Sequence, residues 1–330
     1  MKHLLYGAFI RAYQALALLG IHLYLAYRLP GDIYGVIALG FAVSGICQIV
    51  GKAGLDEFAT REIPRLANAS GVTIFARDMR GCVIKHNLRI QFLLFVAGIV
   101  GWSQGLSVQQ LVFFSLMSVA GNIGALLAVA LGVRKGLGYG GLSEYPDAVL
   151  RVTFFALGVA LLSVFSHCTL LALATVYLAS TVVATLWAWL RLPLAKDPGK
   201  TALAGKVRLR HGFPFAIAGA GIALLPEIVL LIFGSMGEER EVGMLSLGMK
   251  IGSVAVMGLM AINLVSAPRI SALFHQRKIP ELQSWLHHVS RVSFAFALLV
   301  LAGVWASHMA LVHMESKYLS EAVSLALIVT

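Results

Sequence analysis

Charged residues are scarce in this chain of 330 residues. Asp, Glu, Lys and Arg together make up 12% of it, whereas hydrophobic residues make up 59%. A typical soluble domain is about one quarter charged, because its surface must be hydrated. The composition therefore excludes an ordinary soluble domain and indicates a protein whose surface faces lipid.

Cysteine is scarce as well. Cys47, Cys82 and Cys168 lie far apart and form no CxxC pair. The neighbouring His287 and His288 have no cysteine or pair of carboxylates near them in the sequence. Disulfide frameworks and metal sites need such clusters, so we expect neither, and we expect no cofactor.

Long apolar runs, in contrast, are abundant. They are about 20 residues long, the length of an α-helix that crosses a hydrocarbon core roughly 30 Å thick. We therefore predict an all-α polytopic membrane protein with about ten transmembrane helices. The predicted spans cover residues 4–27, 33–53, 84–104, 108–132, 148–166, 169–192, 213–235, 242–265 and 290–312, and a tenth begins near residue 320.

A dense charged stretch follows the second predicted span directly. Residues 54–65 read GLDEFATREIPR, and five of these twelve residues are charged. We expect the stretch to leave the span at the cytoplasmic face. An interfacial helix is predicted to continue from it to about residue 80.

The net charge of +11 is distributed unevenly along the chain. With the N-terminus in the cytoplasm, the predicted inner segments carry most of the lysines and arginines. The predicted outer loops carry only Arg28, Arg240 and Lys317. This asymmetry follows the positive-inside rule, so the basic balance predicts topology and attraction to anionic membrane lipid. It argues against nucleic acid as a partner.

The sequence contains an internal repeat. IYGVIALG (33–40) and EVGMLSLG (241–248) align two pairs of glycines at an offset of 208 residues. Pro64-Arg65 and Pro268-Arg269 follow at an offset of 204 residues. Both copies lie on spans predicted to run inward, so the repeat is parallel, which is typical of transporters with a substrate site between the halves.

The repeat predicts two six-helix lobes. We assign residues 1–195 to the N-terminal lobe, 196–210 to a basic cytoplasmic linker and 211–330 to the C-terminal lobe. Two units of about 205 residues need about 410, and this chain has 330. The second lobe is therefore expected to be incomplete, and the chain to be truncated at its C-terminal end.

Several stretches carry a resemblance to a known family. They are GDIYGVIAL (31–39), GLDEFATREIPRL (54–66), RKGLGYGGLSEYPDAVLR (134–151), EVGMLSLGMKIGS (241–253) and INLVSAPRISAL (262–273). In content and order they resemble the oligosaccharide flippases of the multidrug/oligosaccharidyl-lipid/polysaccharide exporter superfamily. The resemblance implies two lobes around a cavity that opens alternately to each side of the bacterial inner membrane. It also implies an undecaprenyl-pyrophosphate-linked glycan as substrate and no enzymatic activity.

Three other functions stay open. A multidrug exporter of the same superfamily is expected to have a more acidic cavity. An integral-membrane glycosyltransferase or ligase is expected to have a large outer loop or clustered outer carboxylates, whereas the outer loops here are short. The chain could also be a non-functional flippase fragment.

Charged residues inside predicted spans are the candidate site residues, because burying a charge in a membrane is costly. Cations on a cavity wall would bind pyrophosphate, and snorkelling to the membrane surface is the structural alternative for each. The candidate cavity cations are Arg11, Lys52, Arg89 and Lys250.

Glu227 and Lys250 form a sharper candidate pair. Each lies about eight residues from the predicted outer end of its span, which places both roughly 12 Å deep. They are predicted either to neutralise each other or to couple transport to a proton or Na⁺. Pro226 precedes Glu227 and is expected to kink that helix.

Arg61, Arg65 and Arg269 flank the two Pro-Arg exits. We predict that they form a cytoplasmic gate that meets the incoming pyrophosphate.

Overall fold

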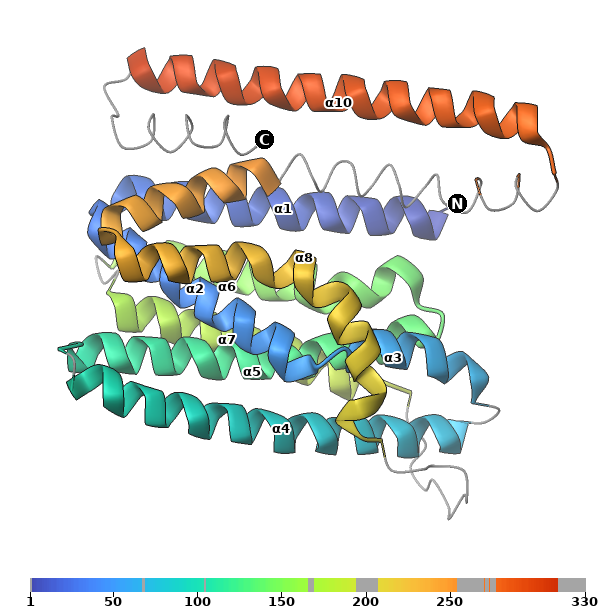
Figure 1. The fold of residues 1–330 in the computed structure, drawn as a ribbon, viewed down its shortest axis with the longest axis horizontal. Helices are drawn as coiled ribbons and strands as arrows, with labels where there is room; N and C mark the ends of the chain where they lie inside the picture. The colour runs from blue at the N-terminus through green and yellow to red at the C-terminus, as the bar shows by residue number, and fades with distance from the viewer. Residues whose placement is uncertain are drawn as a thin grey trace. The chain divides into compact units, whose positions relative to one another are not determined.

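The computed structural model describes residues 2–66, 69–103, 105–165, 169–193, 207–253, 270, 273 and 277–313 (Figure 1). Nearly all of these residues are helical, and none of them lies in a β-strand, which confirms the predicted all-α class. The long helices are α1 (Lys2–Arg28), α2 (Gly31–Lys52), α4 (Ala69–Ser103), α5 (Val108–Gly136), α6 (Val152–Val164), α7 (Leu170–Leu190), α8 (Leu209–Met236) and α10 (Ile279–His313). Shorter elements are α3 (Leu55–Glu62), η1 (Ile63–Arg65), η2 (Gly140–Glu144) and η3 (Pro146–Arg151), and residues 239–253 are also helical.

The chain is a multi-pass membrane protein. In its described part, six helical segments are long and apolar enough to cross a membrane, and the bent helix α8 adds a seventh. These segments match the first seven predicted spans. The helix over residues 239–253 covers the first part of the predicted eighth span, and α10 covers the predicted ninth, whereas the predicted tenth lies outside the described residues.

The segment after the second span differs from the prediction. The charged stretch 54–65 folds into α3 and η1, and α4 then runs without interruption from Ala69 to Ser103. At 1.5 Å per residue, its 35 residues extend over about 52 Å, well beyond a hydrocarbon core of roughly 30 Å. The stretch after the second span is therefore helical, but this helix ends at Arg65 and does not continue to residue 80, because residues 69–80 belong to α4.

The described residues belong to two compact units. One comprises residues 37–236, and the other comprises the described parts of 1–36 and 237–330. Each unit is described below by itself. The predicted division at residues 195 and 211 stays a prediction.

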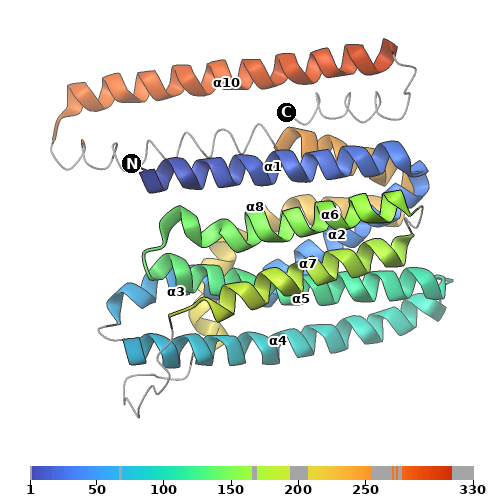
Figure 2. The same cartoon turned by 180° about the vertical axis from the view of Figure 1, so that it is seen from behind.

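Helix α5 is the centre of the 37–236 unit. It packs against α3, α4 and α7, and α7 lies between α5 and α6 (Figure 2). Its buried face includes Phe113, Met117, Leu127 and Val133. One apolar cluster joins this helix to α3 and α4 through Leu55, Val129 and Met79, among other residues.

Glycines let α2 and α3 approach α5 closely. A Cβ built on Gly121 would lie 2.2 Å from the Ser44 carbonyl oxygen of α2. A Cβ on Gly132 would lie 2.3 Å from the Asp56 carbonyl oxygen of α3. Lipid supplies no hydrophobic drive for helix association, so close van der Waals packing through small residues replaces it.

The other unit contains α1, the start of α2 and the helix over residues 239–253. His22 Nδ1 and Tyr34 Oη are buried and hydrogen-bonded at 3.0 Å. A Cβ on Gly35 would clash with the carbonyl oxygen of Glu239. Close backbone approach therefore requires the first of the two aligned glycines in this copy of the sequence repeat.

Packing at Gly132 predicts opposite effects for two Gly→Ala substitutions. Gly132→Ala is expected to destabilise the protein by about 1–3 kcal/mol, because α3 must move away from α5. Gly81→Ala in α4 is the control, since its Cβ would meet nothing within 4 Å. Alanine is the better helix former by about 1 kcal/mol, so this control is expected to hold or raise the thermal midpoint in detergent. Equal midpoints for the two variants would contradict the close packing.

Candidate functional site

A tight backbone junction joins α2 to α3. Ala53 and Gly54 adopt left-handed conformations, with φ of 47° and 72°. This conformation ends α2 at Lys52 and lets α3 begin in a new direction at Leu55. In α3, Leu55, Ala59 and then Ile63 recur at four-residue spacing and are buried, so the charged side chains occupy the other faces.

The start of α8 packs directly on this junction. A Cβ on Gly54 would lie 2.3 Å from the Gly212 carbonyl oxygen. A Cβ on Gly212 would lie 2.3 Å from the Ala53 carbonyl oxygen. Beside this contact, the Phe58 ring of α3 stacks on His211, with ring centroids 5.5 Å apart. Gly54 and Gly212, which are 158 residues apart in the sequence (212 − 54), thus let the two backbone segments come into direct contact.

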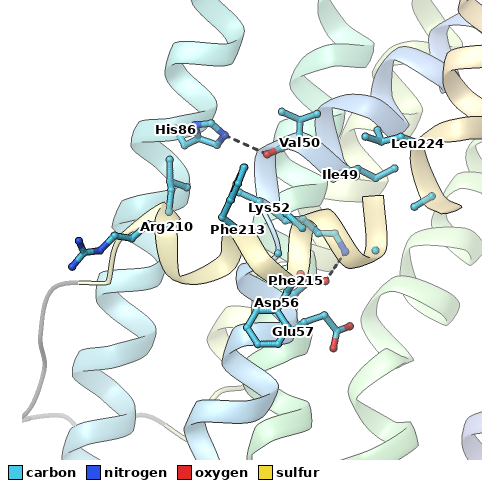
Figure 3. Close-up of a pocket in the computed structure, with 16 residues that line it drawn as sticks. Ile49, Val50, Lys52, Asp56, Glu57, His86, Arg210, Phe213, Phe215 and Leu224 are labelled. Atoms are coloured by element: carbon cyan, nitrogen blue, oxygen red, sulfur yellow. Dashed lines mark hydrogen bonds and ion pairs between the residues drawn. The ribbon is translucent and has the colours of Figure 1, made fainter. Parts of the chain in front are cut away.

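A cavity of about 670 Å³ lies between the α2–α3 junction, α4 and α8 (Figure 3). Its volume is within the range of roughly 300–1,000 Å³ that is common for ligand sites. Most of its lining is apolar, and the polar groups are few. The side chains that line it include Ile49, Val50, Leu209, Phe213, Phe215 and Leu224, with Lys52, Asp56, Glu57, His86 and Arg210 as the charged or titratable groups.

Two of the titratable groups in the cavity, Lys52 and His86, have specific hydrogen-bond partners. Lys52 Nζ donates to Asp56 Oδ2 at 2.6 Å, so this pair is neutralised. The other oxygen, Asp56 Oδ1, is buried and has no hydrogen-bond partner within the described residues. His86 Nε2 lies 3.3 Å from the Val50 carbonyl oxygen and donates to it. His86 thereby satisfies one carbonyl group near the C-terminal end of α2.

Helix α8 is sharply bent beside the cavity. Its segments Leu209–Gly219 and Ala223–Met236 meet at 74°. Pro226 follows the break. In a straight helix its ring would clash with the backbone carbonyl of residue 222, and it has no N–H to donate to that carbonyl. Gly219 and Gly221 add backbone freedom at the same place. The bend agrees with the kink expected from Pro226.

Glu227 lies just beyond the end of the cavity that is farther from α3. A Cβ on Gly45 of α2 would lie 3.1 Å from Glu227 Cδ. Glu227 is one helical turn after Ala223, and Gly45 is one turn before Ile49; both Ala223 and Ile49 line the cavity. Side chains four residues apart share a helix face, so the carboxylate borders the cavity within the membrane helices.

The structure brings only some of the predicted site residues together. Lys52 lines the cavity, and Arg89 is exposed on α4, three residues after His86. Arg11 is exposed on α1, where its Nη1 donates to Gln14 at 3.3 Å. Lys250 lies in the helix over residues 239–253, in the other unit from Glu227, so their pairing stays a prediction.

The predicted gate residues lie at the end of α3 and beyond it. Arg61 and Arg65 are exposed, and Arg65 Nη1 pairs with Glu62 Oε1 at 2.8 Å. Arg269 lies outside the described residues. Whether the three arginines form a gate stays a prediction.

Sequence reasoning missed several groups at this site. Asp56 and His86 were not among the candidates, and neither were the aromatic residues Phe213 and Phe215 of α8. The spacing of Lys52 and Asp56 is the signal for their pair, since opposite charges four residues apart commonly meet. Nothing local in the sequence predicts that His86 would meet α2, because that contact depends on how α4 packs.

Ion pairs elsewhere in this unit are structural. Lys135 in the last turn of α5 pairs with Glu144 of η2 at 2.6 Å. Arg151 Nε lies 2.8 Å from Asp147 Oδ1, and its Nη1 donates to Tyr177 at 2.9 Å. In the described part of the chain, no three His, Cys, Asp or Glu side chains are placed to bind a metal ion.

Comparisons with known proteins show what this arrangement resembles. No protein-family model matches the sequence, and no curated protein does. Among solved structures, an inward-facing multidrug resistance MATE family transporter of the MOP superfamily matches with a TM-score of 0.73 and 16% identity. The match covers 97% of this chain and 79% of the transporter. The chain has the MATE transporter fold.

Two further structures of MOP superfamily transporters support the fold assignment. A MOP superfamily transporter from Pyrococcus furiosus matches with a TM-score of 0.65 and 13% identity over 99% of this chain and 76% of its own. An outward-facing multidrug resistance MATE family transporter matches with a TM-score of 0.60 and 12% identity over 98% and 76%. At such identities the likeness concerns the fold, and substrate must be argued from the site.

Proposed function

We propose that this protein is a secondary transporter that flips a polyprenyl-pyrophosphate-linked oligosaccharide across the bacterial inner membrane by alternating access. The observation that carries the proposal is the cavity between α2, α4 and the bent helix α8. Its walls are apolar and its few charged groups lie at defined places, which suits an amphiphile with a long chain and an ionic headgroup. The transporter fold of the structural neighbours supports a transport role, and transport of this kind needs no catalytic residue.

The charge on one side of the cavity is positive and favours an anionic substrate, whereas Glu57 lies on the other side. Arg210 and His86 line it, and the exposed cations Lys85 and Arg89 of α4 flank His86. The acidic Asp56 is neutralised by Lys52. Arginine binds phosphate oxygens through two hydrogen bonds, and lysine binds them as a point charge. Cationic groups at this mouth would attract a pyrophosphate and repel a cationic drug.

A multidrug exporter is the second candidate, and the structural neighbours fit it equally well. Two observations favour it. Phe213 and Phe215 line the cavity, and aromatic faces bind cationic or aromatic drugs. Glu227 lies in a membrane helix beside the cavity, where a carboxylate could bind a cation.

The remaining assignments follow from the same proposal. The partners are the lipid-linked glycan and membrane lipid, with no nucleic acid. The N-terminus lies in the cytoplasm, so the α2–α3 junction and the start of α8 face inward. The arginines at positions 61, 65 and 269 form the cytoplasmic gate for the headgroup. Glu227 couples the cycle to a proton or Na⁺, alone or with Lys250.

Deleting the gene in its bacterial host is expected to trap the substrate on the inner leaflet. Lipid-linked glycan, extracted and quantified by mass spectrometry, should accumulate several-fold and return to normal when the gene is restored. Sensitivity to a panel of cationic drugs should stay unchanged in the same strains. Normal glycan-lipid levels together with drug hypersensitivity would overturn the flippase proposal in favour of the drug exporter.

Replacing Glu227 with Gln tests the coupling role. Gln keeps the shape but carries no titratable group, so export should fall at least tenfold and lose its dependence on pH between about 5 and 8. Glu238→Gln, an exposed carboxylate outside the spans, is the matched control and should behave as wild type. Export by the Glu227→Gln variant that follows the wild-type pH profile would remove Glu227 from the coupling mechanism.

A further inference from the structure

Two buried polar side chains meet between α1 and the start of α2. His22 Nδ1 lies 3.0 Å from Tyr34 Oη, and the two residues are 4% and 0% exposed. His22 lies within the candidate membrane span Phe9–Arg28, six residues (28 − 22) or roughly 9 Å from its end. An ionisable side chain at such a position is a candidate for a functional role, because its charged form is costly there.

Lys250 approaches this pair from another helix of the same unit. At the start of the helix over residues 239–253, the Glu239 carbonyl packs against Gly35, next to the buried tyrosine. Lys250 follows Glu239 by eleven residues (250 − 239), about three turns, so both positions share a face of the helix. Long helical side chains point back toward the N-terminus of their helix, which directs Lys250 toward the level of His22. Its charge acts on His22, and it has no carboxylate partner among the described residues.

The other charged groups of these elements lie farther away. Arg11 precedes His22 by eleven residues (22 − 11), about 16 Å along α1. The charged residues near the beginnings of α2 and of the helix over residues 239–253 are all exposed; they are Asp32, Glu239, Arg240 and Glu241. The titratable groups that face His22 from these two elements are therefore one hydroxyl and one cation.

A proton on His22 and the charge of Lys250 would repel each other, because a nonpolar interior screens charges weakly. The amine is the stronger base, so the positive charge lies on Lys250 while His22 is neutral and hydrogen-bonded to Tyr34. An anion that binds Lys250 removes this repulsion, and His22 can then bind a proton. By linkage, a proton on His22 strengthens the binding of the anion by the same factor.

We propose that His22 binds a proton when an anionic substrate neutralises Lys250, so that this pair links proton uptake to substrate binding. The proton comes from water, and the Nδ1–H of the imidazolium then donates to Tyr34 Oη. The inference rests on the proposed transport of an anionic substrate. It assigns a proton site to the unit that does not contain Glu227.

Titration of His22 tests the linkage directly. The measurement is NMR of isotope-labelled histidine in the purified protein in phosphatidylcholine nanodiscs, with the His22 signal assigned by its loss in a His22→Asn variant. Lys250→Gln removes the charge and should raise the proton affinity of His22 about tenfold, which moves the titration midpoint by about one pH unit. Lys250→Arg keeps the charge and should leave the midpoint unchanged. Arg240→Gln, which removes an exposed cation from the same helix, should leave it unchanged as well.

A polyprenyl pyrophosphate added to the wild type should raise the midpoint as Lys250→Gln does, and it should have no further effect on the Lys250→Gln variant. Transport provides the second readout. His22→Asn keeps a hydrogen-bonding group toward Tyr34 but cannot bind a proton, so glycan-lipid flipping in proteoliposomes should lose most of its stimulation by a proton gradient. His288→Asn, the same change at an exposed histidine near the start of α10, should keep the stimulation.

Three outcomes would overturn the proposal. Equal titration of His22 in the wild type and the Lys250→Gln variant would remove the linkage between the two groups. A midpoint that the polyprenyl pyrophosphate leaves unchanged would show that the anion does not neutralise Lys250. Full stimulation of the His22→Asn variant by the gradient would remove His22 from transport. In each case the flippase proposal stands if gene deletion still traps the glycan lipid, so the two failures are distinguishable.

Discussion

Close backbone contact through glycine is the constraint on which the rest of this structure depends. Gly121 and Gly132 of α5 let backbone carbonyl oxygens of α2 and α3 pack directly against α5. Gly54 and Gly212 allow the same close packing between the α2–α3 junction and α8. In lipid, exclusion of water does not drive helices together, so they associate through close van der Waals packing, which requires small residues at the contact. The cavity lies where α8 is fixed at its start by this contact and bends by 74° between Gly219 and Ala223.

The distribution of charge follows from the same environment. Several ionic groups occur as short-range pairs, such as Arg151 with Asp147 and Lys135 with Glu144, because an isolated charge is costly in a low-dielectric interior. Lys52 and Asp56 follow this rule inside the cavity. The buried Arg134 lies instead over the rings of Tyr139 and Trp187. The exposed cations Lys85 and Arg89 of α4 have no carboxylate partner among the described residues, and this contrast directs attention to an anionic ligand beside the cavity.

Much of the fold could be predicted from the sequence, because crossing a membrane is a local property of about 20 residues. The first seven spans and the kink at Pro226 were predicted in this way. The continuous helix α4 was not, since its polar first turns, with Arg77 and Arg80, resemble an interfacial segment. The cavity could not be predicted at all, because it depends on a contact between Gly54 and Gly212. The positions of Lys52 and Arg89 along their predicted spans suggested both as candidates. Position along a span does not say which way a helix face points, and the structure places Lys52 in the cavity and Arg89 on the exposed side of α4.

The central claim is that an anionic glycan lipid, and not a cationic drug, crosses the membrane through this protein. The most direct measurement is flipping in proteoliposomes that contain the purified protein and a polyprenyl-pyrophosphate oligosaccharide, with a membrane-impermeant glycosidase outside. The account predicts that the protected half of the glycan lipid becomes cleavable within minutes when a proton or Na⁺ gradient is applied, and that empty liposomes keep it protected. Continued protection of the glycan lipid, with uptake of an ethidium-type cation by the same proteoliposomes, would contradict it.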